Sequence, residues 1–483
     1  MDLLIKNATI FTMDEKEEMI KGSLLIDGTK IKAIFPHALG DEPNIQAREI
    51  MDGSSLIILP GMTNAHYHSY SNLLKGTESS LPLELWSLYT VAYGHSLQDE
   101  DIALAVQLGV IEQIRSGVTC CIDHFPHIAR AEAALKSYEQ TGIRVGFAPM
   151  MHDVPDHHFL RVQLPNKITE RIEAVRPKSV DWMREFYTTL LKYWNGKNNK
   201  IRILLGPNAP QRCSKEMLSL CKDLSISEKM LVHTHLLESK VQKYWGDRSF
   251  SKGLVGKLNE AGLLNERLST AHSVWLEEQE LAALSEKGVT FVHNPASNMM
   301  LGSGRAAVGK WLKYGANVAL GTDSSNCGIS HNMFETMRLA VMLHRYGNEE
   351  EVWIKPIDTL KMATIGGAKL LGEADCRGKI KVGYEADLVL INKAHTPYCV
   401  ETDLATQLVL YESGHSIEAL MVAGEWLMKD KKLITIDEQK VITSVQERSS
   451  EFLKRCPPAV REVEELLPYF REMYESISKE AIL

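Results

Sequence analysis

The chain has 483 residues, and its 54 lysine and arginine residues against 62 aspartate and glutamate residues give a formal net charge of −8 at pH 7. This length exceeds the roughly 200–250 residues of a plain α/β barrel, so we expect one large domain and a smaller one. The acidic balance and the lack of a Lys/Arg-rich run exclude the usual pattern of nucleic-acid-binding proteins, so no nucleic-acid partner is expected.

The amino-terminal sequence lacks the basic start and apolar stretch of a secretory signal, and no apolar run reaches the about 18 residues of a membrane span. We therefore expect a cytoplasmic protein with no membrane partner. Eight cysteines occur without a CxxC pair, and Cys120 and Cys121 are adjacent. This pattern indicates reduced thiols rather than a disulfide framework.

Two β-rich segments flank a long central segment. Residues 1–59 contain short alternating runs separated by turn residues, and residues 372–435 show the same signals. We predict that the two segments pair into one small β-sandwich domain. The last segment, 436–483, favours an amphipathic helical appendage that is interrupted at Pro457 and Pro458.

The central segment, 60–371, alternates apolar strand-like runs with helix-period stretches, which is the pattern of repeated βα units and a parallel sheet. Eight such strands can be counted, namely MTNAHYH, GVTCCIDHF, RVGFAPMM, KIRILLGP, MLVHTHL, RLSTAHSV, GVTFVHNP and NVALGTDS. Eight units close a barrel. The predicted fold class is therefore α/β, a (β/α)8 TIM-like barrel with a small β-sandwich domain built from the two terminal segments.

Histidines gather where these strands end. His66 and His68 are two residues apart on a predicted strand, so both imidazoles point to the same face. With 17 histidines in the chain, one HxH pair is weak evidence, and His233 and His235 form a second pair. Position strengthens the signal, because HxH, HTHLLE, AHS and GTD end the first, fifth, sixth and eighth strands. In a barrel, such positions predict the site of chemistry.

The motifs PGMTNAHYH, HTHLLES, AHSVWL, HNPASNMMLGSG and LGTDSSNCG resemble the successive signatures of the amidohydrolase superfamily, over essentially the whole chain. The pattern is similar to its mononuclear deaminase and chlorohydrolase branch, which includes S-adenosylhomocysteine and guanine-type deaminases and triazine hydrolases. The resemblance implies a hydrolase with two groups of site residues. They are the metal ligands His66, His68, His235 and Asp323, and the catalytic residues Glu238, His272 and, again, Asp323.

Three histidines and a carboxylate with one open position suit Zn²⁺, with Fe²⁺ as the alternative. His233 shares a face with His235 and is the alternative ligand if the strand register differs. Dinuclear relatives carry a carboxylated lysine at the end of strand four, whereas this chain reads KIRILLGPNAPQRCS, with no lysine where that strand ends. One divalent metal ion per chain is therefore predicted.

The six residues also predict a reaction. A bound divalent ion lowers the pKa of its water, and Asp323 can take the released proton with assistance from His272. Glu238, three residues after His235, can protonate a ring nitrogen. We therefore predict a metal-dependent deaminase that hydrolyses an amino-substituted nitrogen heterocycle of the purine, pyrimidine or pterin type. Weaker candidates for substrate contact lie after the strands, with Trp86 in the loop after strand one; these candidates are Trp86, Asn208, Gln211 and Asn298.

Alternatives remain for the function. The same residues could expel chloride or an alkylamine from a triazine ring. A dinuclear site could open a cyclic amide, which the missing lysine disfavours. A metal-free, non-enzymatic scaffold is a different class, and the presence of all six proposed residues speaks against it. Because relatives commonly form homodimers, a homo-oligomer is expected.

Overall fold

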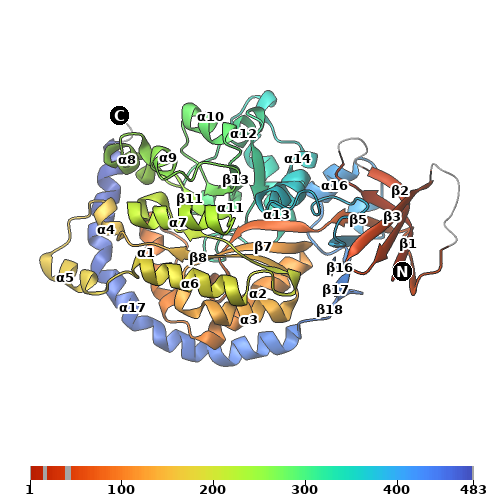
Figure 1. Cartoon of the computed structure of the whole chain (residues 1–483), viewed down its shortest axis with the longest axis horizontal. Coiled ribbons are helices and arrows are strands. Elements are labelled where there is room, and N and C mark those ends of the chain that lie inside the picture. The colour runs from red at the N-terminus through yellow and green to blue at the C-terminus, as the bar shows by residue number, and fades with distance from the viewer. Residues whose placement is uncertain (1, 15–18, 38–44, 481–483) are drawn as a thin grey trace.

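The computed structural model describes residues 2–14, 19–37 and 45–480. Figure 1 shows a large α/β part joined to a β-rich part that holds the N-terminus. All eight predicted central strands are present in the large part. They are β6 (Met62–Tyr67), β7 (Val118–Phe125), β8 (Arg144–Met151), β9 (Ile201–Ile203) with β10 (Gly206–Pro207), β11 (Val232–Leu236), β12 (Leu268–His272), β13 (Thr290–His293) and β14 (Asn317–Leu320).

The predicted fourth strand is present as β9 and β10, which pair with β8 in one register on either side of Leu204 and Leu205. The N–H group of Leu204 donates to the carbonyl of Phe147 on β8, at 2.8 Å. The next N–H group, that of Leu205, donates instead to the carbonyl of Leu231 beside β11, also at 2.8 Å. Alternate N–H groups of this strand therefore bond to the neighbours on its two sides, and pairing with β8 resumes at Gly206.

The central strands form two parallel sheets, in the orders β10-β8-β7-β6 and β11-β12-β13-β14, and β9 also pairs with β8. Isolated parallel bridges join their edges, one between Leu205 and Val232 and the other between Tyr67 and Asp323. The carbonyl of His66 accepts from the N–H groups of Thr322 and Asp323, both at 3.0 Å. The first and last central strands therefore meet at residues predicted to bind metal.

Helices follow these strands and cover the sheets. In α2 (Asp99–Arg115), the buried residues Ile102, Val106, Val110 and Ile114 recur at helical spacing and pack into the main core. The other covering helices are α3 (Ala131–Thr141), α6 (Val180–Tyr193), α7 (Lys215–Ser227), α8 (Lys240–Ser249), α9 (Gly253–Glu260), α10 (Glu278–Glu286), α12 (Val308–Lys313), α13 (Met333–Leu343), α14 (Pro356–Lys361) and α15 (Gly367–Leu370).

The two terminal β-rich segments pair with each other, as predicted. Within the N-terminal segment the strands are β1 (Leu3–Phe11), β2 (Met19–Asp27), β3 (Lys30–Pro36), β4 (Glu49–Asp52) and β5 (Leu56–Pro60). The later segment supplies β15 (Leu388–Asn392), β16 (Ile417–Val422), β17 (Glu425–Lys429) and β18 (Lys432–Leu433).

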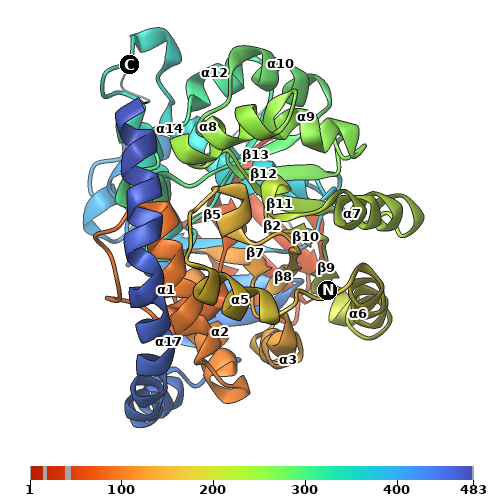
Figure 2. The ribbon, with the colours of Figure 1, turned by 90° about the vertical axis from the view of Figure 1, so that its left-hand side faces the viewer.

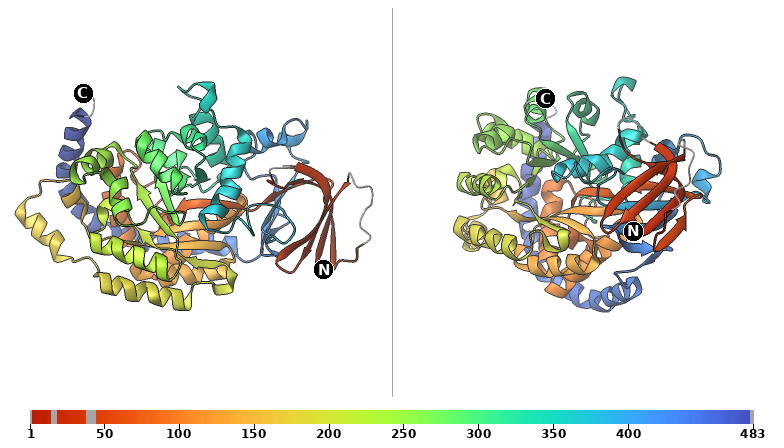
Figure 3. Two further views of the ribbon diagram at one scale, coloured as in Figure 1. Left: turned by 45° about the horizontal axis from the view of Figure 1, so that its top comes forward. Right: turned by 45° about the vertical axis from the view of Figure 1, so that its right-hand side comes forward.

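Antiparallel pairing of β5 with β15 joins both segments into one nine-stranded sheet. Its hydrogen bonds describe one sheet rather than two, so they do not confirm the predicted sandwich. The sheet has its own apolar core, with members such as Ile26, Ile58 and Leu390. Figure 3 shows this sheet at the end of the molecule that holds the N-terminus.

The predicted interruption of the C-terminal segment at Pro457 and Pro458 is wrong. A single helix, α17 (Glu438–Glu480), continues through both prolines and through Pro468. Each proline removes one backbone hydrogen bond, but Phe452, Cys456, Val463 and Phe470 are buried. This packing outweighs the local loss. Figures 1 and 2 show the helix curving around the large part and passing α1 (Leu83–His95). Within the described ranges, no helix is long and apolar enough to cross a membrane.

Glu412, which follows α16 (Leu404–Leu410), is a buried carboxylate that fixes a loop of the β-rich part. It accepts hydrogen bonds from the Tyr398 hydroxyl at 2.8 Å and from the N–H groups of Ser413, Gly414 and Ser416 at 2.8–3.2 Å. Burial alone would raise the pKa of this carboxyl, but these hydrogen bonds outweigh it and hold the pKa below its usual value.

Replacing Glu412 with glutamine should lower the free energy of unfolding by about 1–3 kcal/mol at pH 7. The folded-state pKa is depressed, so the stabilisation is present above the ordinary glutamate pKa of 4.5 and is lost as pH falls through the folded value. Urea denaturation of both proteins at pH 7 and pH 4 checks this. An equal difference at both pH values would contradict it.

Candidate active site

The four predicted metal ligands lie together although they come from distant parts of the chain. His66 lies on β6 and His68 follows it, His235 lies on β11, and Asp323 follows β14. Oδ1 of Asp323 is 3.2 Å from Nε2 of His68 and 3.6 Å from Nε2 of His66. Nε2 of His235 is 3.4 Å from Nε2 of His68. Three imidazole nitrogens and one carboxylate oxygen therefore converge on one point.

Backbone carbonyls orient two of these rings. Nδ1 of His68 donates to the carbonyl of His124 at 2.5 Å, and Nδ1 of His235 donates to the carbonyl of Asn208 at 2.6 Å. Metal-binding histidines usually have their second ring nitrogen held in this way, which fixes the tautomer. In both rings Nε2 is the nitrogen that remains available to bind a metal ion.

His233, the alternative ligand, lies behind His66 rather than beside the other donors. Its Nε2 is 2.8 Å from Nδ1 of His66, and its Nδ1 is 2.8 Å from Oγ of Ser269. Nε2 of His66 is buried and has no hydrogen-bond partner in the described part of the chain. Both nitrogens of His233 are thus engaged, while His66 directs a free nitrogen towards Asp323.

The protonation of these groups fits a cation. Burial lowers the pKa of His66 and His235 well below 6.5, so both rings are neutral and able to bind metal. Burial alone would raise the pKa of Asp323, but the nearby His66 and His68 rings outweigh it and hold the pKa well below 3.8. His68 differs, because burial alone would lower its pKa but the hydrogen bond and charge of Asp323 outweigh it and raise the pKa, so a cation bound there would displace a proton. Three imidazoles and one carboxylate are a donor set that fits Zn²⁺.

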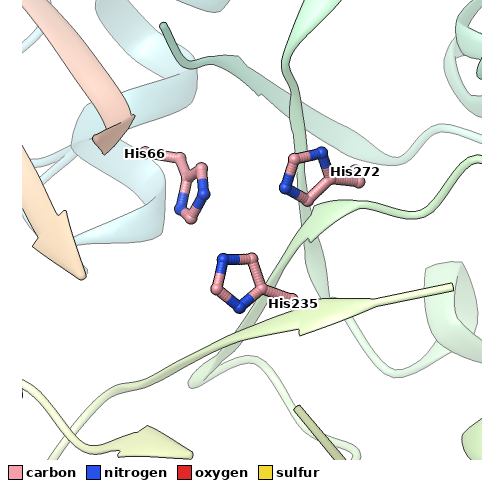
Figure 4. A group of neighbouring side chains, drawn as sticks. All are labelled: His66, His235 and His272. Carbon is pink, nitrogen blue, oxygen red and sulfur yellow. The ribbon is translucent and has the colours of Figure 1, made fainter. Parts of the chain in front are cut away.

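His272 and Glu238 lie beside this donor set. Nε2 of His272 is 3.6 Å from Oε2 of Glu238 and 3.7 Å from Oδ2 of Asp323. Figure 4 shows the rings of His66, His235 and His272 arranged around a common space. Asn298 on α11 (Pro295–Met300) holds the other side of His272, with 2.9 Å between its Oδ1 and Nδ1 of the ring.

Glu238 is suited to donate a proton. Its side chain is buried, and its Oε1 has no hydrogen-bond partner among the residues that the structure describes. Burial, reinforced by the negative charges of Asp323 and Glu84, raises the pKa of this carboxyl well above 4.5. This carboxyl, beside the metal donors, therefore favours its protonated form more than a free glutamate does.

The backbone of the site is strained at two of the residues that carry its chemistry and at Leu237, the residue before Glu238. Leu237, His272 and Asp323 have φ values of 46°, 70° and 62°, in the left-handed region that side chains other than glycine rarely adopt. Gly321 allows the close approach of β14 to β6, because a Cβ atom there would lie 2.8 Å from Cβ of His66. Such geometry is expected where side chains must be held in fixed directions.

A cavity opens above the donor set, and three of the four predicted substrate-contact residues line it, namely Trp86, Asn208 and Gln211. Trp86 lies on helix α1 rather than in a loop, which corrects its predicted setting. Asn298 is not among the lining residues and contacts His272 instead. His68, His235, Glu238, His272 and Asp323 also line the cavity.

The sequence reasoning missed Arg212, which lines the same cavity. Its Nη1 donates to Oδ1 of Asn208 at 2.9 Å, and its Nε and Nη2 donate to the carboxylate of Asp156 at 2.6 and 2.7 Å. Its position next to Gln211 was the only available signal, since Asp156 is remote in the sequence. Nε1 of Trp86 and Oε1 of Gln211 are buried without a hydrogen-bond partner in the described ranges.

Parallel strands with a His/His/His/Asp donor set at their carboxyl ends define the general class of metal-dependent barrel-type hydrolases. Residues 57–427 match the model of the Amidohydrolase family. The 5-methylthioadenosine/S-adenosylhomocysteine deaminase of Pyrococcus furiosus is 34% identical over 442 residues, which cover 91% of this chain and 98% of that relative. This chain belongs to the amidohydrolase family, which confirms the predicted resemblance.

Solved structures with the same fold include two zinc-containing proteins. An adenosine deaminase from Xanthomonas campestris with bound zinc superposes with a TM-score of 0.85 at 23% identity, covering 94% of this chain and 99% of the other. The atrazine chlorohydrolase TrzN from Arthrobacter aurescens TC1, complexed with zinc, gives a TM-score of 0.83 at 21% identity, covering 92% and 100%. At these identities the likeness shows the fold alone.

Proposed function

We propose that this protein is a metal-dependent aminohydrolase that removes the exocyclic amine from an amino-substituted nitrogen heterocycle, with adenosine-type nucleosides as the first substrates to test. The observation that carries the proposal is the buried carboxyl of Glu238, which lines one cavity together with the metal-donor residues His68, His235 and Asp323. The name of the Pyrococcus furiosus relative supports deamination over the loss of another leaving group.

The chain's own residues account for the proton transfers. One divalent ion per chain, Zn²⁺ before Fe²⁺, supplies Lewis-acid activation of water when bound to the four donors. Glu238 gives its proton to a ring nitrogen, which makes the adjacent amino-bearing carbon electrophilic. Oδ2 of Asp323 receives a proton from the attacking water, and His272 lies 3.7 Å from that oxygen. As the C–N bond breaks, Asp323 returns the proton to the departing amine, which leaves as ammonia, and the new hydroxyl group becomes a carbonyl by giving its proton to Glu238.

Binding of the heterocycle is proposed to rest on the cavity wall. Trp86 offers an aromatic face and a buried Nε1–H without a partner, and Gln211 offers an unpartnered Oε1. Asn208 and Arg212 add amide and guanidinium groups on the same wall. A planar ring with nitrogen donors and acceptors is the ligand that this combination favours.

An ammonia-release assay of the zinc-reconstituted protein tests the proposal. The panel contains adenosine, 5-methylthioadenosine, S-adenosylhomocysteine, guanine, cytosine, an amino-substituted pterin and aminotriazines. We expect release from at least one purine derivative. Chloride or alkylamine release from triazines, with no ammonia from any purine, pyrimidine or pterin, would overturn deamination and favour the triazine alternative.

Asn298 is proposed to position His272 rather than to touch substrate, because it accepts from Nδ1 of that ring. Replacing Asn298 with alanine should lower kcat by about 10–100-fold, the usual range for groups that orient a site residue, with metal content unchanged. Asn298→Asp keeps the acceptor oxygen and should restore most of the rate. Steady-state kinetics with metal analysis checks both, and a change in KM alone would contradict the positioning role.

The domain limits also remain proposals. We propose a closed (β/α)8 barrel over 60–371, a small β-sandwich from 1–59 and 372–435, and a helical appendage over 436–483. The two bridges between the central sheets support barrel closure. A homodimer in the cytoplasm is proposed as the working form, which sedimentation analysis and cell fractionation would test.

A further inference from the structure

A second group of possible metal ligands lies outside the cavity, on two short helices between β8 and β9. We infer that His157 and His158 on α4 (Asp156–Phe159), together with Glu173 on α5 (Asn166–Ala174), form a surface site for a divalent transition-metal ion. The site shares no residue with the catalytic donor set, so it goes beyond the proposed function.

The three side chains offer their donor atoms to one point. Nε2 of His158 is 2.9 Å from Oε1 of Glu173, and Nε2 of His157 is 3.8 Å from the same oxygen. All three donor atoms lie within 4.8 Å of one another. The two imidazole rings are 4.3 Å apart, centroid to centroid. One ion can therefore contact two nitrogens and one carboxylate oxygen after small rotations of the side chains.

His157 points independently to a ligand. Its side chain is only 7% exposed, and its Nε2 has no hydrogen-bond partner within the described part of the chain. A buried ring nitrogen without a partner costs free energy unless something satisfies it.

The other two residues leave the site open to solvent. The side chains of His158 and Glu173 are 52% and 47% exposed, so an ion can enter and water can complete its coordination. Two imidazoles and one carboxylate suit Zn²⁺, Cu²⁺, Ni²⁺ or Co²⁺, whereas Mg²⁺ and Ca²⁺ prefer oxygen ligands throughout. The expected occupant is therefore a reversibly bound transition metal.

Such an ion would fix the position of α5, which makes few other stabilising contacts with the rest of the molecule. None of the residues of α5 is buried, so α5 has no apolar anchor in the core. Arg171 forms an ion pair with Glu465 on α17 at 2.7 Å, but both side chains are about half exposed, and such pairs stabilise little. Figure 1 shows α5 at the outer edge of the molecule. A metal bridge from α4 to α5 supplies the missing attachment.

The site also adjoins the wall of the substrate cavity. Asp156, next to His157 in the chain, binds Arg212 through both carboxylate oxygens, and Arg212 lines the cavity. An ion at His157 would hold α4 and thereby Asp156. We therefore expect occupancy to affect substrate affinity through Arg212 rather than the chemical step.

Metal counting tests the inference. Apo protein is titrated with Zn²⁺ and analysed for bound zinc after gel filtration, in the wild type, in a His158→Gln/Glu173→Gln variant, and in Glu170→Gln as a control. Glu170 is an exposed glutamate on the same helix. We expect the double variant to bind one equivalent less than the wild type and the control to match the wild type.

The rate of backbone hydrogen exchange in residues 156–174 provides a second measurement of zinc binding. Zinc should slow exchange in this segment in the wild type and in Glu170→Gln, but not in the double variant. Equal zinc content in the wild type and the double variant, or protection by zinc that survives both substitutions, would overturn the inference. Because these substitutions leave the catalytic donor set intact, the outcome does not depend on the proposed function.

Discussion

The His68→Ala variant should bind no stoichiometric catalytic metal and should show no measurable turnover. Nε2 of His68 lies 3.2 Å from Oδ1 of Asp323 and 3.4 Å from Nε2 of His235, so its loss removes the donor that contacts both neighbours. Changes to groups that merely orient a ligand cost about 10–100-fold in metal affinity, so losing a ligand should cost at least about 100-fold. Competition with a zinc chelator measures this affinity.

The variant is best made in the His158→Gln/Glu173→Gln background, so that only the catalytic ion is counted. His37→Ala, which removes an exposed histidine after β3, is the matched control and should keep full metal content and activity. A His68→Ala protein that retained one tightly bound equivalent would show that the donor set is assigned wrongly.

The Glu238→Gln variant should keep its metal and lose about 10²–10⁴-fold in kcat, the range usual for a general acid. Glutamine preserves the size of the side chain but cannot give up a proton to a ring nitrogen. In the wild type, burial and the negative charge of Asp323 raise the pKa of this carboxyl well above 4.5, which favours its protonated form. Steady-state ammonia release and metal analysis of the same samples measure both properties.

The pH profile supplies a further check on Glu238. Because the active form is protonated and its pKa is raised, the rate should fall as pH rises through that pKa, and this limb should be absent from the residual activity of Glu238→Gln. Glu216→Gln, an exposed change in the first turn of α7, is the control and should keep the full profile. Undiminished turnover in Glu238→Gln would rule out its role as the acid.

The central strands could be predicted because short apolar runs alternate with stretches of helical periodicity along the sequence. His66 and His68, two residues apart, share a face of the chain at the end of β6, and the motifs around His272 and Asp323 come where β12 and β14 end. The carboxyl ends of parallel strands lie at one edge, so these positions were enough to bring the donors together.

Features that depend on distant contacts could not be predicted. The N–H group of Leu205 donates to the carbonyl of Leu231 beside β11 and so links the two central sheets, a contact between residues distant in the sequence. The presence of Pro457 predicts an interruption of the C-terminal helix. The helix is nevertheless continuous, because its apolar face is buried against the large part. Arg212 enters the cavity wall through its bond to Asp156, which no local pattern reveals.

The meeting of β6 with the segment after β14 has a consequence for the order of events during folding. His66 and Asp323 are linked through the backbone as well as through their side chains, and His235 comes from the strand sequence between them. The donor set is therefore incomplete until the last central strand has docked against the first. Metal binding should therefore be a late step in folding that follows the docking of β14 against β6. The bound ion then stabilises the native state.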